Sequence, residues 1–572
     1  MITGISIENF KGIRERVDLE LKPITLLFGS NSAGKSSILH ALQLAQEAIL
    51  RNNPSPDETL VGGGSVNLGG FRMFVHNRSF ETPVKLGFQI SLDDPDVFFG
   101  TEMETVSSFL TGAYAYDEWF DCFAFFEQAR IEIEIRGTGT QGAFLSSFVL
   151  EIEGEPFAEI STDRPGGRQV LRLNSAHPAL IKISNGVNPD EIVAQGADPE
   201  VVRANLDAMS MPLLKGCLDA LQELVEAIPQ PDGIVSPWQS FFLDGIASVV
   251  PVGEDRLPFV RKRLDSDEFD QVVKRFESVL DNGSIYYFLS EVIDGISKLI
   301  TVPLTEVVRF LESFRYLGPI REVPKRIHQT PSRSDIGRWA SGLGAWDLLE
   351  TANDAFIAEV GDWLGNEDRL NAGYRVAMKR FKELDLSDPN VARLLSGRDV
   401  EDDSEEPQIR LSDLPTQSRL VVIPTKGSIE LRPGDIGIGI SQVVPVIVTA
   451  LDGKGRLLAI EQPELHLHPR IQAEIADLFI EACQKKHHRF LIETHSEHCI
   501  LRLQRRIRET ADAKHADGRE LMSDDVVIYH VSSEEGRTGV SRIDLDRNGE
   551  FVQPWPDDFF EIDFYERFGH DR

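Results

Sequence analysis

The stretch Gly29-Ser30-Asn31-Ser32-Ala33-Gly34-Lys35-Ser36 decides the fold. It satisfies G-x-x-x-x-G-K-[ST], it follows the apolar run Ile24–Phe28, and it opens a segment, Lys35–Arg51, whose apolar residues recur at three and four. This pattern predicts a buried strand, a loop and a helix with one buried stripe. Small residues let backbone N–H groups approach phosphates, and a helix N-terminus adds positive partial charge. A chance glycine-rich turn is the alternative.

The loop therefore predicts a site for ATP and Mg²⁺ as cofactors. Lys35 is expected to reach the β and γ phosphates, and Ser36 to ligate Mg²⁺. The loop residues expected to hold the nucleotide are Gly29, Ser30, Asn31, Ser32, Ala33, Gly34, Lys35, Ser36 and Ser37.

A second carboxylate for the metal is predicted at Glu461. The preceding run, Leu457–Ile460, is apolar, as in a buried strand that delivers an acid to the C-terminal edge of a sheet. P-loop ATPases need such an acid near Mg²⁺, so Glu461 is the expected metal residue together with Ser36. Glu464 could position or deprotonate the attacking water. Alternatively, Glu464 is a first-turn acid that favours the next helix.

Composition narrows the class of protein. The chain has 572 residues and a formal net charge of −33, which works against loose wrapping by DNA or RNA, so any nucleic-acid contact must be local. No apolar run is long enough to span a membrane, and no secretory signal is visible, which favours a cytoplasmic protein. The four cysteines form no C-x-x-C pair, so a disulfide framework is disfavoured.

The pattern along the chain predicts an α/β protein. Ile2–Ile7 is an expected strand, and period-two alternation between about Val84 and Leu173 predicts an antiparallel sheet. Six acids within Asp399–Glu406 indicate an exposed linker. Beyond it, alternating strands and helices predict a parallel sheet with helices packed on it. The strands expected there are Leu420–Ile423, Ile429–Leu431, Leu457–Ile460 and Phe490–Ile492, and the helices begin at Val443 and Pro469.

Four motifs, in order along the chain, resemble those of an ABC-type ATPase head of the RecF, SMC and OLD group, often classed with the AAA-type ATPases. They are the loop with Asn31, the signature region Asp435–Gln442, the Walker B loop Glu461–Pro469 and the switch-histidine segment Glu493–Ser496. The resemblance covers roughly residues 1–80 and 415–530. It implies a P-loop ATPase head with a mixed sheet, an antiparallel β subdomain and a large, mainly helical insertion.

The division expected on this basis has five parts. They are an N-terminal lobe of the head with the β subdomain at 1–173, a mainly helical insertion at 174–396, an acidic linker at 397–410, a C-terminal lobe of the head at 411–535, and a small C-terminal hairpin segment at 536–572.

The resemblance also implies a mechanism. In such heads two chains sandwich two nucleotides, and the signature serine of one chain caps the nucleotide of the other. Ser441 and Gln442 would fill that role, and His495 would contact the γ-phosphate. The partner is then at least a second copy of the chain. The alternatives are that Ser441 is a plain N-cap of a helix from Val443 and that His495 lies in a surface turn.

One departure from the family concerns Gln462. Many heads carry a glutamate there, and an amide cannot accept a proton as a carboxylate can. Slow hydrolysis is expected, with either Glu464 as the base or a long-lived dimer. The expected catalytic residues are thus Glu461, Gln462, Glu464 and His495.

A finer resemblance lies in Tyr316–Arg321 and Trp555–Phe560, as in a bacterial subgroup whose relatives serve in anti-phage systems such as PARIS, Septu and OLD-like nucleases. It implies a sensor or switch for a separate effector, such as a nuclease. A RecF-like DNA-repair or DNA-clamping ATPase, or a slow-turnover scaffold, remains an alternative.

The basic clusters, the histidines and one Asp-x-Asp pair each have a structural and a functional interpretation. Basic residues cluster within 315–338 and on Arg502, Arg505 and Arg506, which indicates either ion-paired surfaces or a DNA or protein contact. The histidines at 466, 468, 495 and 498 lack a suggestively spaced third zinc ligand. The pair Asp544 and Asp546 lies in an expected hairpin that turns at Asn548-Gly549, which disfavours a Toprim-like nuclease.

Overall fold

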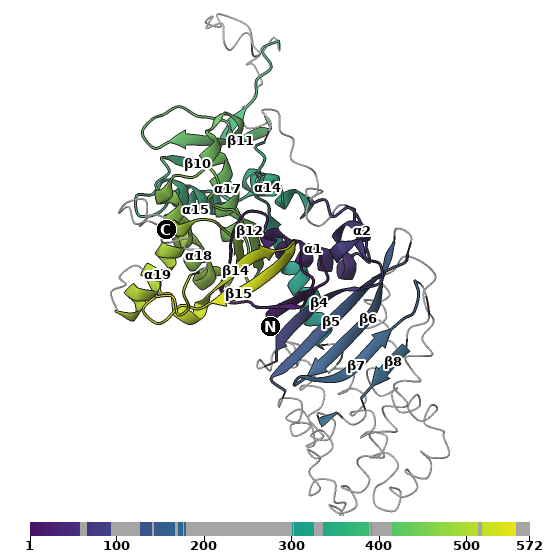
Figure 1. Ribbon diagram of the computed structural model, residues 1–572. Coiled ribbons are helices and arrows are strands. Elements are labelled where there is room, and N and C mark those ends of the chain that lie inside the picture. Colours follow the sequence, from purple (N-terminus) through teal and green to yellow (C-terminus); the bar gives the residue numbers. More distant parts are fainter. Residues whose placement is uncertain are drawn as a thin grey trace, which may run out of the picture. The chain divides into compact units, whose positions relative to one another are not determined.

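The computed structural model describes most of both ends of the chain (Figure 1). The described residues are 1–57, 66–92, 126–139, 142–165, 167, 170–174, 177–178, 300, 302–324, 336–387, 391, 414–512 and 518–555. They divide into two compact units, each considered by itself. Unit 1 comprises Met1–Phe314 and Val526–Ile543, and unit 2 comprises Arg315–Asp525 and Asp544–Arg572.

Unit 1 contains a seven-stranded sheet in which each neighbouring pair is antiparallel (Figure 1). The predicted alternation is confirmed, since Ile131, Ile133 and Ile135 are buried between less buried glutamates. In sheet order, the strands are β2 (Val17–Glu20), β1 (Ile2–Glu8), β4 (Val84–Ser91), β5 (Gln128–Gly137), β6 (Ala143–Ile152), β7 (Glu155–Ser161) and β8 (Val170–Leu173).

The strand, loop and helix around the glycine-rich loop form as predicted. Strand β3 (Ile24–Phe28) is buried throughout and α1 (Lys35–Leu50) follows the loop. Helix α1 is buried on more than one stripe, because its polar residues Gln43, Gln46 and Glu47 are buried as well. Beside β3 runs β14 (Val526–Glu534) in parallel, and β14 pairs antiparallel with β15 (Arg537–Ile543).

Short helices and one longer helix complete unit 1. Residues Phe71–Phe74 form α2 and His76–Arg78 form the 3₁₀ helix η1. Residues 302–313 are helical, and Phe310 within them contacts Phe88 of β4, with ring centroids 6.1 Å apart.

Unit 2 is built on three parallel strands with helices packed around them. Strand β12 (Leu457–Glu461) lies between β13 (Arg489–Glu493) and β9 (Arg315–Leu317). The parallel arrangement predicted for this region is confirmed for β12 and β13. The α-helices are α14 (Leu343–Thr351), α15 (Asp354–Gly365), α17 (Ile438–Leu451), α18 (Pro469–Lys486) and α19 (Glu497–Ala511), and the 3₁₀ helices are η3 (Ile336–Trp339), η4 (Pro433–Asp435) and η5 (Ser523–Asp525).

Three local expectations for unit 2 are corrected. A strand, β10 (Tyr374–Lys382), lies within the predicted helical insertion and forms an antiparallel ribbon with β11 (Thr416–Pro424). Ile429–Leu431 is no strand, because only Leu431 pairs, through a single bridge to Val422. Helix α17 begins at Ile438 rather than Val443, since burial of its later turns outweighs the low helix propensity of the glycines.

Several expectations lie outside the described residues. These include the linker at 397–410, the stretch beyond Trp555, and residues 179–299 of the insertion expected at 174–396. The turn at Asn548-Gly549 is confirmed, because Leu545 bridges Phe551 across it and Asp546 N donates to Glu550 O at 2.8 Å. Within the described part of the chain, no helix is long and apolar enough to cross a membrane.

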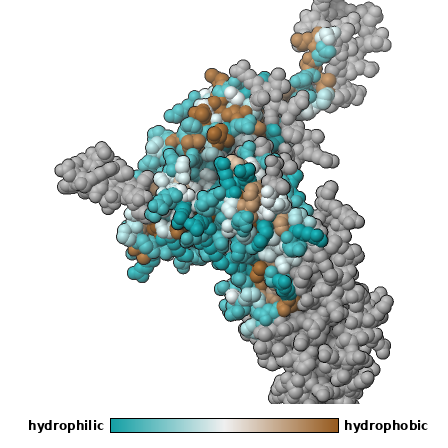
Figure 2. Space-filling view, turned by 45° about the vertical axis from the view of Figure 1, so that its right-hand side comes forward, coloured by the Kyte–Doolittle hydropathy of each residue, from teal (hydrophilic) through white to brown (hydrophobic). Residues whose placement is uncertain are grey.

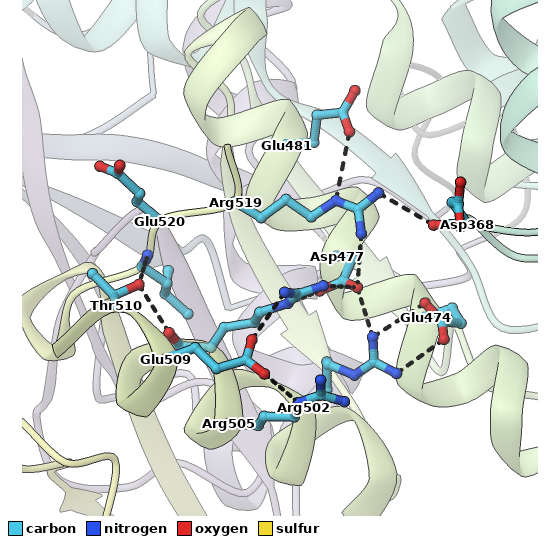
Figure 3. A network of polar contacts seen from close by, with 12 residues as sticks. Asp368, Glu474, Asp477, Glu481, Arg502, Arg505, Glu509, Thr510, Arg519 and Glu520 are labelled. Carbon is cyan, nitrogen blue, oxygen red and sulfur yellow. Dashed lines mark hydrogen bonds and ion pairs between the residues drawn. The ribbon is translucent and has the colours of Figure 1, made fainter. Parts of the chain in front are cut away.

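A network of ion pairs joins α18 to α19 in unit 2 (Figure 3). Asp477, which is 1% exposed, accepts hydrogen bonds from three guanidinium groups, those of Arg502, Arg506 and Arg519. Arg505 is paired with Glu509 at 2.6 Å. For these arginines the ion-paired interpretation of the sequence is confirmed.

Candidate functional site

The glycine-rich loop of unit 1 has a backbone that only glycine accommodates at two positions. Gly29 has φ +146° and Gly34 has φ +107°, both in the region that L side chains rarely adopt. A Cβ atom on Gly29 would collide with the backbone oxygen of Val531, and one on Gly34 with the hydroxyl of Thr538. The β14–β15 hairpin therefore backs the loop closely, and the two glycines permit that approach.

Lys35 is held over the loop from the first turn of α1. Its side chain is buried, and Nζ donates to Gly29 O at 3.1 Å and Ser30 O at 2.9 Å. Ser30, Asn31 and Ser32 are exposed at the loop tip, and Ser36 and Ser37 are half-buried in the helix. A phosphate chain fits a site that has a buried ammonium group in the first turn of a helix and exposed small residues at the tip of the preceding loop.

Unit 2 holds the predicted metal carboxylate at the end of β12. Glu461 is 4% exposed, and its Oε1 accepts a hydrogen bond from the hydroxyl of Tyr316 at 2.7 Å. Tyr316 comes from β9, which pairs with β12 so that Tyr316 lies beside Ala459. Burial, reinforced by the negative charge of Glu461, raises the pKa of Tyr316 well above its usual value, so the hydroxyl remains a donor. An ionised carboxylate has about four lone-pair sites, so a carboxylate that accepts from the Tyr316 hydroxyl can also ligate a Mg²⁺ ion.

The side chain of Arg321 contacts the backbone of Glu461 and Gln462. The sequence did not predict this position for Arg321. Its side chain is 2% exposed, and Nη2 donates to the backbone oxygens of Glu461 at 2.6 Å and Gln462 at 3.3 Å. The sequence placed Arg321 in a basic surface stretch, and its burial corrects that expectation. Burial lowers its pKa to about 10, which leaves it charged at neutral pH.

Glu464 connects the loop after β12 to the segment after β13. Its Oε1 accepts from the backbone N–H of His495 at 2.7 Å, and its Oε2 accepts from the hydroxyl of Thr494 at 2.9 Å. Burial raises the pKa of Glu464, although these hydrogen bonds oppose the shift. The first-turn interpretation of Glu464 is wrong, because α18 has no acid in its first turn and begins at Pro469.

The signature serine lies inside α17. Gly437 caps the helix, so the N-cap interpretation of Ser441 is wrong. Ser441 is 1% exposed, and its hydroxyl donates to Ile438 O at 2.8 Å. The amide of the neighbouring Gln442 pairs with the backbone of Arg321, accepting from its N–H at 3.2 Å and donating to its oxygen at 2.7 Å.

An open pocket of about 380 Å³ adjoins these residues in unit 2. Its lining includes Ser441, Gln442, Arg321 and two exposed apolar side chains, Ile320 at 78% and Ile438 at 60% exposure. On the face seen in Figure 2, hydrophilic groups dominate and hydrophobic groups gather in separate patches.

The histidines have distinct settings. His495 is half-buried directly after β13, with its backbone N–H bound to Glu464. His468 caps α18, where its Nδ1 accepts from Arg470 N at 3.3 Å, and His466 is exposed. Among the described residues, no group of three or more His, Cys, Asp or Glu is arranged to hold a metal ion by itself. Two other basic residues, Arg315 and Arg338, are paired with acids.

The structure thus brings together, within unit 2, five of the residues expected from the sequence. Gln442, Glu461 and Gln462 meet at Arg321, and Glu464 meets His495 through its backbone. The residues that sequence reasoning missed are Tyr316, Arg321 and Thr494. The signal for Tyr316 and Arg321 was the resemblance of the stretch Tyr316–Arg321 to a bacterial subgroup. No local pattern in that stretch shows what either residue does.

Comparison with known proteins gives a family-level match and weak structural likenesses. Residues 1–107 and 402–500 match a family described as an AAA ATPase domain. No curated protein matches the chain. The crystal structure of an Smc head bound to the C-terminal winged-helix domain of ScpA is similar with a TM-score of 0.34 and 9% identity, over 96% of this chain and 98% of that one.

Two other solved structures are similar to the same extent. The Smc head domain of Pyrococcus furiosus, with an extended coiled coil and bound to the C-terminal domain of ScpA, has 11% identity and a TM-score of 0.33 over 95% of this chain and 96% of that one. The SMC head domain of Thermotoga maritima has 8% identity and a TM-score of 0.32 over 95% and 99%. Of the two segments that match the AAA ATPase domain family, residues 1–107 fall in unit 1 and residues 402–500 in unit 2.

Proposed function

We propose that this protein binds ATP with Mg²⁺ and hydrolyses the γ-phosphate bond. The observation that carries the proposal is the geometry of the loop, in which two obligatory glycines and the buried Lys35 form a cradle that fits phosphates. Lys35 binds the β and γ phosphates, and Ser36 and Glu461 hold the metal. When bound, Mg²⁺ supplies charge neutralisation and orients the phosphates.

Two alternatives remain for the activation of water. Either Glu464 acts as the general base, or the site has no general base and hydrolysis is slow. Both carboxylate oxygens of Glu464 accept hydrogen bonds from Thr494 and His495, which supports a positioning role and slow turnover. Gln462, which directly follows Glu461, orients water without taking its proton. If Gln462→Glu accelerates hydrolysis while Glu464→Gln leaves it unchanged, Gln462 is the reason for slow turnover. Unchanged rates in both variants would remove both residues from the catalytic account.

The proposed output is an ATP-dependent homodimer. Ser441 and Gln442 of one chain would cap the nucleotide of the other, and ATP would stabilise the dimer by mass action. The Ser441 hydroxyl is engaged within its own helix, so its contribution to the cap requires that hydroxyl to rotate from Ile438 O. The exposed Ile320 and Ile438 beside it suit a protein contact.

The biological setting proposed is control of a partner effector, such as a nuclease, in bacterial defence against phage. The stretch Tyr316–Arg321 supports this setting by resemblance alone. A DNA-clamping ATPase is the competing class, and salt-sensitive DNA binding that depends on ATP would favour it.

The decisive experiment measures ATP binding by calorimetry, phosphate release, and mass in solution. Wild type is expected to bind ATP and to form a dimer with ATP but not with ADP. Lys35→Met should abolish binding, and Glu461→Gln should bind ATP but release phosphate more slowly. If wild type takes up no ATP, or if Lys35→Met binds ATP as wild type does, the proposal is wrong.

A further inference from the structure

Arg321 connects two parts of unit 2, each of which lies more than a hundred residues from it along the chain. On one side lies the Gln442 segment at the start of α17, and on the other the Glu461–Gln462 turn at the end of β12. Five hydrogen bonds make the connection. Two join the backbone of Arg321 to the Gln442 amide, one joins Nη1 to Gln442 O at 3.4 Å, and two join Nη2 to the oxygens of Glu461 and Gln462.

The chemistry of these contacts is unusual for an arginine. The side chain is 2% exposed, yet its hydrogen-bond acceptors are backbone oxygens rather than a carboxylate. A buried guanidinium group is costly unless its charge is compensated, and here Glu464 and Glu461 supply negative charge without forming an ion pair with it. A planar fork directed at two backbone segments fixes their relative position, which a hydrophobic residue of the same size could not do.

We propose that Arg321 is a positioning residue that makes the Gln442 segment and the Glu461–Gln462 turn move as one body. This inference rests on the proposed ATPase function and deepens it. In that function the Gln442 segment meets the nucleotide of a second chain, while Glu461 holds the metal of its own. Arg321 then links capping by one chain to the placement of the metal carboxylate, and Tyr316 holds the carboxylate itself.

The proposal separates the effects on binding from those on turnover. Nucleotide affinity derives mainly from the loop of unit 1, which Arg321 is not part of. Arg321→Met, and Arg321→Lys, whose point charge cannot bridge both segments, should therefore keep the ATP dissociation constant within about 3-fold of wild type. The turnover number should fall about 10- to 100-fold, the order expected when a reacting group is misplaced by about 1 Å.

A matched control and a readout independent of activity complete the test. Arg338→Met removes an arginine of the same unit that pairs with Asp347, and it should leave turnover unchanged. Hydrogen exchange should speed up in Arg321→Lys at both 438–445 and 461–468, and not in the β10–β11 ribbon.

The outcomes are distinct. Wild type without ATP uptake overturns the proposed function, whatever Arg321 does. Wild type that hydrolyses ATP while folded Arg321→Met turns over at the same rate overturns this inference alone. So does hydrogen exchange that speeds up on one side of Arg321 only.

Discussion

Asp477 is the residue whose removal should destabilise unit 2 most clearly. It lies on α18, is 1% exposed, and accepts hydrogen bonds from Arg506 at 2.8 Å through both carboxylate oxygens (Figure 3). In Asp477→Ala, Arg502 retains Glu474, whereas Arg506, itself 8% exposed, loses both hydrogen bonds to Asp477 and retains its pair with Glu509. The variant therefore removes part of the negative charge that compensates a buried cation.

The magnitude follows from those contacts. Removing one partner of a buried ion pair typically costs about 3 to 5 kcal/mol, because the remaining charge stays buried. We expect Asp477→Ala to lower the free energy of unfolding by about 3 kcal/mol or more. The exposed pair of Arg505, a side chain that is 59% exposed, is the control, and Arg505→Ala should cost less than about 1 kcal/mol.

Urea unfolding of the full chain measures the loss, and hydrogen exchange of peptides from α18 and α19 localises it. Adding Arg506→Met to Asp477→Ala should recover part of the lost stability, because the uncompensated cation is then gone. A loss no larger than that of Arg505→Ala, or unchanged exchange in both helices, would refute the reasoning.

Three further outcomes are expected. Gln43→Met should raise the free energy of unfolding in urea by about 1 kcal/mol, because both amide atoms of Gln43 are buried without a partner among the described residues; a loss would contradict this. Burial lowers the pKa of His488 to about 4, below its unfolded value of about 6.5, so its contribution to stability is present above pH 6.5 and is lost as the pH falls toward 4. Unfolding titrations should show that loss in wild type and not in His488→Gln. Gly29→Ala should abolish ATP binding and destabilise the fold, because its Cβ atom would collide with the backbone oxygen of Val531. The control Gly154→Ala, where φ is +81° and the surrounding space is open, should lower the free energy of unfolding by only about 1 kcal/mol. Equal losses of stability in the two variants would count against the close approach of β14.

Some elements were predictable because their signals are local. Ile24–Phe28, the loop and α1 follow from an apolar run, glycines and a helical repeat that occupy consecutive positions. The start of α17 was misplaced for a local reason too, since alternating glycines favour a loop by propensity. Burial of residues 441–451 reverses that preference, and burial depends on neighbours that the segment itself does not specify.

The roles of Arg321 and Gln43 could not be predicted in the same way. An arginine within a basic stretch is usually solvated, and a glutamine within a helix is usually exposed. Both are buried here because of what packs around them. The resemblance pointed to Tyr316–Arg321 without a role, and only the contacts to Glu461 and Gln442 supply one.

By itself, the sequence determined the glycine-rich loop, the strands that alternate in polarity and the acid at the end of an apolar run, because each depends on dihedral preference and side-chain period within a few residues. Only the tertiary structure decided that β14 lies beside β3, that Tyr316 holds Glu461 and that Arg321 contacts two segments more than a hundred residues away from it. Such pairings depend on the packing free energy summed over segments remote in the chain, which no local pattern encodes.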